Sequence, residues 1–168
     1  MPMFKVRLII NIIKMIVLSV IFVHFPLPSY AQMDINKNLS QGETVYVSIY
    51  SNVHAGPKGS PFLLSAMVSI RNTDPKNEIT IDTADYYDTE GKKIESYIKS
   101  PIKLKPLAAT SVNIKENDNR GGPGANFLVK WKSKKLVNQP IIEGVMLGLR
   151  SGQGVSFICP GQILVETK

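Results

Sequence analysis

Beyond residue 31 the chain contains one histidine, His54, and one cysteine, Cys159, the residue types from which a base and a nucleophile could be built. A hydrolytic dyad needs these two groups within hydrogen-bond reach of each other. His54 lies in the turn-forming segment SNVHAGPKG, whereas Cys159 follows the apolar alternation of VSFICPG. Catalytic thiols occupy polar, partly exposed surroundings that lower their pKa. The pattern therefore favours a loop histidine and a buried core cysteine, with a Cys159 and His54 dyad as the alternative.

Acidic residues form a second group that could do chemistry. Four of them, Asp82, Asp85, Asp88 and Glu90, lie across a strand end and the turn DTEG. Acids in such positions usually serve turn geometry and solubility. A small hydrolase that uses the acids near Asp85 is the alternative, but nothing in the spacing fixes the carboxylate separation that glycosidases require.

Metal and cofactor chemistry finds little support in the sequence. A closed zinc site generally needs four Cys or His ligands, and residues 32–168 offer two. The acid and amide run at Glu116–Asn119 is not an EF-hand, because Phe127 occupies the twelfth position, where a glutamate is required. A calcium loop of another type remains open. We expect no resident metal and no cofactor.

The glycine-rich segment Gly121–Asn126 invites comparison with a phosphate-binding loop. No Lys-Ser or Lys-Thr pair follows the glycines, and the next segment, FLVKW, has the character of a strand instead of a helix. We therefore predict a strained sheet connection. Loops on a rigid scaffold often carry function, so this loop and nearby aromatic residues define a candidate ligand or partner site: His54, Tyr86, Tyr87, Gly122, Asn126 and Trp131.

The elements that must position these residues are extended. Residues 43–50 place Val45, Val47 and Ile49 on one face, which is the two-residue period of a half-buried strand. Residues 77–87 begin with Ile79 and Ile81 on one face and continue with Ala84 and Tyr86 on the other, which predicts a bulge between them. Further strands are expected at 63–72, 109–115, 127–132, 141–150, 155–159 and 162–166, with loops at 51–59 and 116–126 and a proline-bounded connection at 101–106.

Strands that recur about every ten residues, with turns between them, predict an all-β chain. We expect a single-domain antiparallel β-sandwich of immunoglobulin-like type, with a small barrel as the alternative. The predicted organisation is a signal peptide at 1–31, a polar lead segment at 32–42 and the β domain at 43–168.

The first 31 residues have the composition of a cleavable secretory signal. A cationic start at Lys5, Arg7 and Lys14 precedes the apolar run MIVLSVIFVHF, and small residues at Ser29 and Ala31 suit cleavage after Ala31. Lys14 shortens the apolar run below the length of about 20 residues that a membrane span needs. We expect export to the periplasm or the exterior without a membrane span after cleavage, and a retained anchor is the alternative.

Composition narrows the range of partners. The formal net charge is +7, but three of the 20 Lys and Arg belong to the predicted signal, so residues 32–168 carry 17 against 13 Asp and Glu, a net charge of +4. One cysteine permits no intramolecular disulfide. The basic cluster of Lys130, Lys132, Lys134 and Lys135 around Trp131 fits a solvated face or a protected sheet edge, or contact with an anionic envelope surface. Nucleic acid is not expected as a partner of an exported chain that lacks a binding motif.

Five ordered strings carry a resemblance to a known family: SIRNTDP (69–75), DYYDTEGK (85–92), GGPGANFLVKW (121–131), PIIEGVMLG (140–148) and QGVSF (153–157). Together they resemble the bacterial family of secreted proteins known as domain of unknown function 3124. The resemblance implies a signal peptide or lipid attachment and a compact β domain, with no established activity, substrate or cofactor. The expected function is that of a non-catalytic binding or interaction module of the envelope, whose partner is a protein, a glycan or a small ligand.

Overall fold

The computed structural model describes residues 39–150 and 152–166, and the predicted signal peptide and most of the polar lead segment lie outside these residues. The described strands are β1 (Leu39–Ser48), β2 (Asn52–Ala55), β3 (Ser60–Leu63), β4 (Ser65–Arg71), β5 (Ile79–Tyr87), β6 (Lys93–Ser96), β7 (Ile102–Leu104), β8 (Ala109–Ile114), β9 (Asn126–Asn138), β10 (Ile141–Arg150), β11 (Gln153–Pro160) and β12 (Gln162–Glu166). Within these ranges no helix has the length and apolarity that a membrane span requires.

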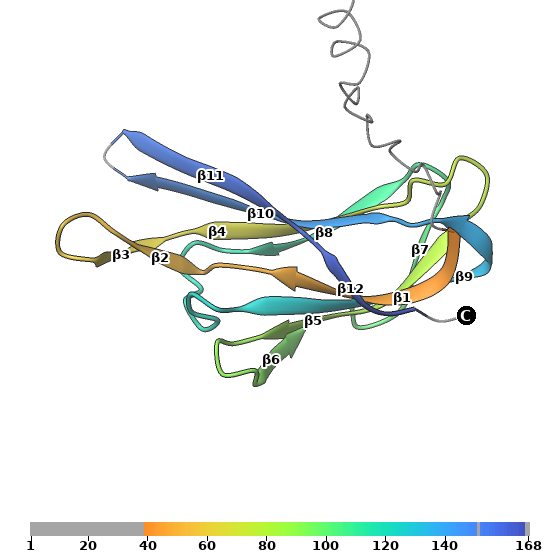
Figure 1. Cartoon of the computed structure of the whole chain (residues 1–168), viewed down its shortest axis with the longest axis horizontal. Helices are drawn as coiled ribbons and strands as arrows, with labels where there is room; N and C mark the ends of the chain where they lie inside the picture. Colours follow the sequence, from red (N-terminus) through yellow and green to blue (C-terminus); the bar gives the residue numbers. More distant parts are fainter. Residues whose placement is uncertain (1–38, 151, 167–168) are drawn as a thin grey trace, which may run out of the picture. The chain divides into compact units, whose positions relative to one another are not determined.

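Two antiparallel sheets lie face to face (Figure 1). One has the strand order β12-β1-β9-β5-β6, with β7 also paired to β5, and the other has the order β11-β10-β4-β8. The short strands β2 and β3 form a hairpin of their own. In the part of the chain that the structure describes, both large sheets keep open edges. The fold is an all-β sandwich, as predicted, and not the closed barrel that was the alternative.

The core follows the predicted alternation. Val45, Val47 and Ile49 are buried in or beside β1, and their counterparts in and beside β4 are Leu64, Ala66, Val68 and Ile70. Inward side chains of the two sheets meet in one continuous cluster. Burial of these apolar faces, at about 25 cal/mol per Å² removed from water, is the main term that stabilises the sandwich.

The predicted bulge in β5 is confirmed. The register of β5 against β9 shifts between Ile81 and Thr83. This extra residue brings Ala84 and Tyr86 back to the inner face, so that they are fully buried together with Ile79 and Ile81. A strand without the bulge would turn Tyr86 toward solvent, because side chains alternate with a period of two.

Several strand boundaries differ from the expectation. β1 begins at Leu39, four residues before the predicted start, and β9 continues to Asn138 instead of ending at Lys132. The segment predicted as a loop at 51–59 contains β2, and the connection at 101–106 contains the short strand β7. These added pieces lack a regular apolar alternation, and backbone pairing with a neighbour creates them.

Lys130 and Lys132 of β9 do not protect a sheet edge. β9 lies between β1 and β5, so it is a central strand. Lys130 and Lys132 point to the outer face while Val129 and Trp131 point inward. Lys132 Nζ lies 3.1 Å from Asp82 Oδ1, and this ion pair occupies part of the face on the six-stranded sheet. Lys130 and Lys132 therefore lie on a solvated face of the sheet, which is one of the alternatives given in the sequence analysis.

A hydrogen-bond network around Asn72 and Asp74 connects the segment after β4 to two other parts of the chain. The amide of Asn72, which is buried, donates to the carbonyl groups of Asn77, Leu104 and Lys105. The Asp74 carboxylate accepts hydrogen bonds from the backbone N–H groups of Lys76, Asn77 and Asn138 at 2.8 to 3.2 Å. These donors, that of Lys76 first, lower the pKa of Asp74 below its ordinary value.

From the lowered pKa of Asp74 we predict that the protein loses stability in acid. Because the folded pKa of Asp74 lies below the unfolded one, its contribution is fully present above the unfolded pKa, near 4, and is lost as the pH falls through the lowered folded pKa. We expect the urea midpoint to fall between pH 6 and pH 3, and to fall less in Asp74→Asn. Asp118, paired with Arg120, has a lowered pKa too and leaves a residual slope. An equal pH dependence in variant and parent would contradict this role of Asp74.

Candidate binding cleft

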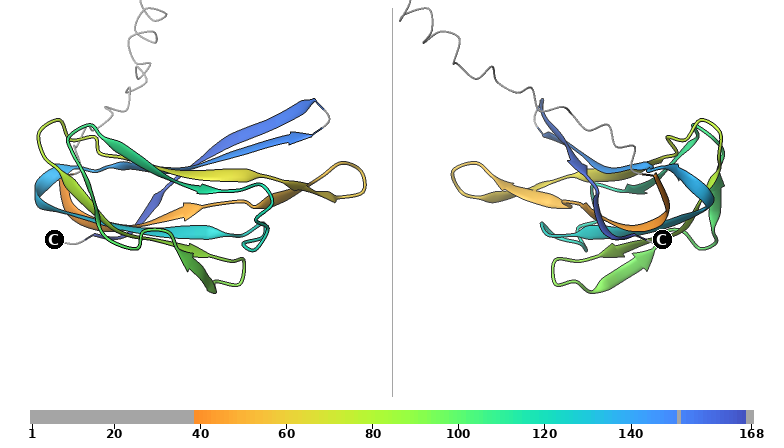
Figure 2. Two further views of the ribbon diagram at one scale, coloured as in Figure 1. Left: turned by 180° about the vertical axis from the view of Figure 1, so that it is seen from behind. Right: turned by 45° about the vertical axis from the view of Figure 1, so that its right-hand side comes forward.

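Two hairpins extend past the same end of the sandwich and diverge there (Figures 1 and 2). The first joins β2 to β3 through a turn in which Gly56 and Gly59 have positive φ, and the Gly59 N–H donates to the Gly56 carbonyl at 3.0 Å. The second joins β10 to β11, with Gly152 at φ 78° next to the closing pair Arg150 and Gln153. Such backbone angles suit glycine, which has no Cβ to clash.

The two hairpins separate where the pairing of β10 with β4 ends, at Leu147 and Ser65. Beyond this point β3 is paired with β2 instead of β10. Gly148 permits the crossing, because a Cβ at this position would overlap Phe62 Cε1 and lie 2.6 Å from Leu64 Cδ2. The Phe62 ring thus packs directly against the β10 backbone at the base of the opening.

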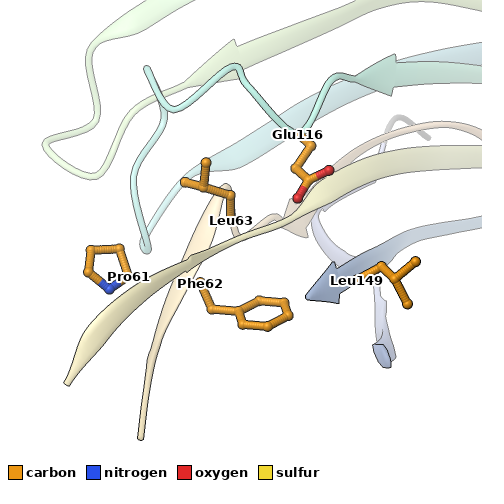
Figure 3. A pocket seen from close by; sticks show the side chains of 5 residues that line it. All are labelled: Pro61, Phe62, Leu63, Glu116 and Leu149. Carbon is orange, nitrogen blue, oxygen red and sulfur yellow. The ribbon is translucent and has the colours of Figure 1, made fainter. Parts of the chain in front are cut away.

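Two neighbouring hollows lie at this end of the sandwich, and we refer to them together as the cleft. The first, of about 340 Å³, is lined by Pro61, Phe62, Leu63, Glu116 and Leu149 (Figure 3). The second, of about 400 Å³, shares Glu116 and Leu149 and extends along the outer ends of β4, β10 and β11. Its lining residues are Ser65, Glu116, Leu147, Gly148, Leu149, Gly154, Val155 and Ser156. Each volume lies within the range of about 300 to 1,000 Å³ that is common for ligand sites.

Exposed aliphatic side chains line both hollows of the cleft. Leu149 is 73% exposed and Leu147 is 54% exposed, and Leu63 and Val155 are also exposed. Among the side chains that the structure describes, Glu116 is the only charged one that lines either hollow. It is exposed and has no hydrogen bond or ion pair with another residue in the described ranges. The cleft is therefore suited to an apolar group that carries a cationic or hydrogen-bond-donating neighbour.

A smaller hollow of about 220 Å³ lies beside Glu43, Gln139 and Pro160. The Glu43 carboxylate is buried, and it already accepts the Trp131 Nε1–H at 3.2 Å and the Gln139 Nε2–H at 2.5 Å. Because both carboxylate oxygens have partners within the fold, this hollow is a weaker candidate for a ligand site.

The structure places two of the predicted ligand residues inside the core. Tyr86 is fully buried, its ring stacks on Phe127 at 5.0 Å, and its hydroxyl lies 2.8 Å from Ser51 Oγ. Burial raises the pKa of Tyr86, so the phenol stays protonated. Trp131 is buried as well and donates to Glu43. Neither ring is accessible for stacking on a ligand, because both are buried in the core.

The other predicted site residues are dispersed. Tyr87 and Asn126 are partners across β5 and β9 and are half-buried. Gly122 has φ 72°, and its carbonyl accepts the Ser51 N–H at 3.1 Å. His54 is exposed on β2, opposite Pro61. The structure thus brings Tyr87 and Asn126 together, whereas His54 and Trp131 lie on different sheets.

The Cys159 and His54 dyad does not form in the described residues. Cys159 pairs with Gly144, which pairs with Val68, and His54 pairs with Pro61. This register separates Cys159 from His54 by seven residues along β3 and β4, about 20 Å at the rise of a strand. Such a separation is incompatible with a dyad.

The Asp85 carboxylate is bound by other side chains of the fold. Its carboxylate lies 2.8 Å from Lys93 Nζ and accepts the Ser96 hydroxyl at 2.7 Å. Burial raises its pKa, but these hydrogen bonds lower it more, so the net shift is downward. A carboxylate held ionised by a lysine is poorly suited to act as a general acid or base near neutral pH. In the part of the chain that the structure describes, no group of three His, Cys, Asp or Glu is placed to hold a metal ion.

Cys159 provides a simple check of this packing. The thiol is half-buried against the core, and burial raises its pKa. A raised pKa lowers the fraction of the reactive thiolate. We expect Cys159 to react with a thiol reagent at pH 7.5 roughly tenfold more slowly in the native protein than in urea. Equal rates in the two states would show that the thiol is exposed and unperturbed.

The residues of the cleft were missed at the level of the sequence. Leu63, Leu147 and Leu149 lie in segments that were predicted as strands, but alternation alone cannot tell a covered face from an uncovered one. A usable signal was present in IIEGVMLGLR, where both faces of one strand are apolar. Glu116 carried no signal for this site, because its neighbourhood forms only in the folded chain.

Comparison with known proteins adds a family and one structure. The family described as "Protein of unknown function (DUF3124)" matches residues 42–164, which confirms the resemblance carried by the five strings. No curated protein matches the chain. The crystal structure of Thermotoga maritima 1070 is similar with a TM-score of 0.46 at 8% sequence identity, covering 77% of this chain and 99% of that one.

Proposed function

Because the chain belongs to the family of proteins of unknown function DUF3124, its function has to be inferred from its own surface, and we propose that it is a non-catalytic binding module of the bacterial cell envelope. Its site is the cleft between the β2–β3 and β10–β11 hairpins. Its ligand is an apolar segment of another envelope protein that carries a lysine or arginine.

The observation that supports this proposal most directly is the concentration of exposed leucines around the cleft. Burying a leucine side chain stabilises a complex by about 1.5 to 3 kcal/mol relative to leaving it in water. Leu63, Leu147 and Leu149 on two diverging hairpins therefore offer several kilocalories per mole to an apolar ligand. Exposed apolar patches with a polar rim are typical of protein interaction sites.

The chemistry of the lining favours a protein segment over a glycan. Recognition of a glycan needs many hydrogen-bonding groups and flat aromatic rings. The cleft presents mainly aliphatic side chains, with one Phe62 ring, the Glu116 carboxylate and the hydroxyls of Ser65 and Ser156. A cationic side chain beside apolar ones complements this lining. The single carboxylate would then select the partner more than it would strengthen the complex, because surface ion pairs contribute about 0 to 1 kcal/mol.

The proposed location rests on residues 1–31, which have the cationic start, apolar run and small-residue close of a secretory signal. We expect the protein recovered from the envelope fraction to begin at Gln32. The mass of the intact protein shows whether the chain begins at Gln32. A chain that retains Met1 and is found in the cytosolic fraction would refute the proposed location.

A labelled probe peptide tests the cleft. A suitable probe is a fluorescein-labelled ten-residue peptide of alternating leucine and serine with one central lysine. We expect Leu149→Asp to weaken its binding at least tenfold, which corresponds to about 1.4 kcal/mol. Leu136→Asp is the matched control, because Leu136 is 59% exposed on β9 and does not line either hollow. Equal binding by both variants, or no binding by the parent protein, would refute the proposal.

A further inference from the structure

Strand β11 is an open edge of the four-stranded sheet, since it is paired with β10 on one side and with no strand on the other among the described residues. Its eight residues, QGVSFICP, carry no charge, and no proline interrupts it before Pro160. It is longer than the other terminal strands of the two sheets: β8 has six residues, β12 five and β6 four. Most of its side chains are exposed.

The register of the hairpin determines which backbone groups of β11 are free. Arg150 and Gln153 form the pair that closes the turn, and the pairs continue to Glu143 and Pro160. In an antiparallel ladder, successive residues of a strand direct their N–H and C=O groups alternately toward and away from the neighbour. Residues 153, 155, 157 and 159 face β10, so Gly154, Ser156 and Ile158 present unpaired N–H and C=O groups at the edge.

Natural sheets usually protect such an edge with charged side chains, prolines or short strands. The β6 edge of this protein shows that protection, because Lys93 pairs with Asp85 and Glu95 pairs with Arg120 at 3.2 Å. β11 has none of these features in its interior. The sequence GVSFIC also has the β-propensity and lack of charge that favour pairing between identical strands.

We propose that β11 is a self-association surface, on which β11 of a second copy of this chain adds in antiparallel orientation about a two-fold axis at Ser156. In this register Gly154 faces Ile158 of the second copy and Val155 faces its Phe157. The edge N–H and C=O groups of Gly154, Ser156 and Ile158 in each strand then pair with backbone groups of the other copy. The cross-strand contact covers Ile158, which is 58% exposed in the single chain.

The absence of charge on β11 is the reason to choose a second copy as the occupant. Two identical edges meet with no like-charge repulsion, and a two-fold pairing satisfies the same groups on both. The contact is small beside the roughly 1,600 Å² of a standard interface. The dimer is therefore weak and dissociates on dilution. This inference does not depend on the proposed function of the cleft.

Sedimentation of the purified full-length protein over a range of concentrations, with reducing agent present to prevent a Cys159 disulfide, tests the pairing. We expect a reversible monomer–dimer equilibrium for the parent and for Ser156→Ala, which keeps the backbone N–H. Ser156→Pro removes that N–H and places a ring in the path of the second strand, while no bond to β10 is lost. It is expected to remain monomeric with an unchanged circular dichroism spectrum.

A second pair of variants tests dimerisation through β11 if Ser156→Pro fails to fold. Ile158→Lys adds equal charges to both edges and is expected to weaken dimerisation at least tenfold. Leu147→Lys, on the same outer face but on β10, is expected to change it less than twofold. A parent protein that stays monomeric at millimolar concentration, or a dimer that persists in Ile158→Lys, would overturn the proposal.

Discussion

Replacing Gly121 with alanine is expected to lower the free energy of unfolding by about 3 kcal/mol. A Cβ at this position would overlap the Tyr86 hydroxyl oxygen and lie 2.6 Å from Ala125 Cβ. The tyrosine has no room to retreat, because its ring is fully buried between Phe127 and Tyr97. Displacing it would also break its hydrogen bond to Ser51, which leaves a buried hydroxyl group unsatisfied.

Urea denaturation followed by circular dichroism measures this effect. Gly154→Ala is the matched control, since the atom nearest to its added Cβ would be 3.8 Å away, and we expect a change within about 0.5 kcal/mol. A Tyr86→Phe substitution removes the overlapping oxygen, so Gly121→Ala should cost less in the Tyr86→Phe background than in the parent. An unchanged cost, or a stable Gly121→Ala protein, would show that the loop can move aside.

The result bears on how the glycine-rich loop is understood. Its first glycine makes room for the Tyr86 hydroxyl, and the Thr89 hydroxyl donates to the Gly121 carbonyl at 2.9 Å and accepts the Gly124 N–H at 3.1 Å. The loop is thus bound to the β5–β6 turn and to the core. These contacts explain the glycines without a phosphate ligand.

Replacing Trp131 with alanine is expected to be the most destabilising of the substitutions considered, at about 4 kcal/mol. The change empties a large buried volume and removes the indole donor from Glu43, which is only 3% exposed. The carboxylate then keeps Gln139 as its remaining hydrogen-bond donor among the described residues. A buried carboxylate that loses a donor costs more than the same loss at the surface.

Further variants separate the loss of buried volume from the loss of the hydrogen bond to Glu43. Trp131→Phe keeps most of the ring volume and removes the donor, and we expect it to cost about 1 to 3 kcal/mol. In a Glu43→Leu background the same change should cost less, because no carboxylate is left unpaired. The transition must be followed by circular dichroism, since Trp131 is the only tryptophan of the chain. A cost below about 1 kcal/mol for Trp131→Ala would contradict its place in the core.

These expectations separate the architecture from the proposed site. Gly121, Tyr86, Trp131 and Glu43 hold the sandwich together, and their replacement changes stability. Leu149 and Glu116 have exposed side chains at the end of the sandwich, so their replacement should change binding while leaving stability within about 0.5 kcal/mol. A binding defect in a fully stable Leu149→Asp protein is therefore informative.

The sequence alone determined most of the longer strands, their inward faces and the bulge in β5. Each of these depends on the alternation of side chains along one strand, which is a local property. Val45, Val68 and Val129 point inward because apolar residues recur at every second position, whichever strand lies next to them. The positive φ of Gly91, a glycine in the turn DTEG, is equally local.

Only the tertiary structure decided which faces are covered and which edges stay open. Alternation alone did not show whether Tyr86 and Trp131 are buried or lie at the surface, and the folded chain buries both in the core. It also did not show that Leu147 and Leu149 stay exposed where β3 diverges from β10. The same holds for β9, where Lys130 and Lys132 lie between two neighbouring strands, and for β11, whose outer edge has no neighbour among the described residues. Burial depends on partners that are distant in the sequence, and so the cleft and the open edge appear only once the strands are assembled.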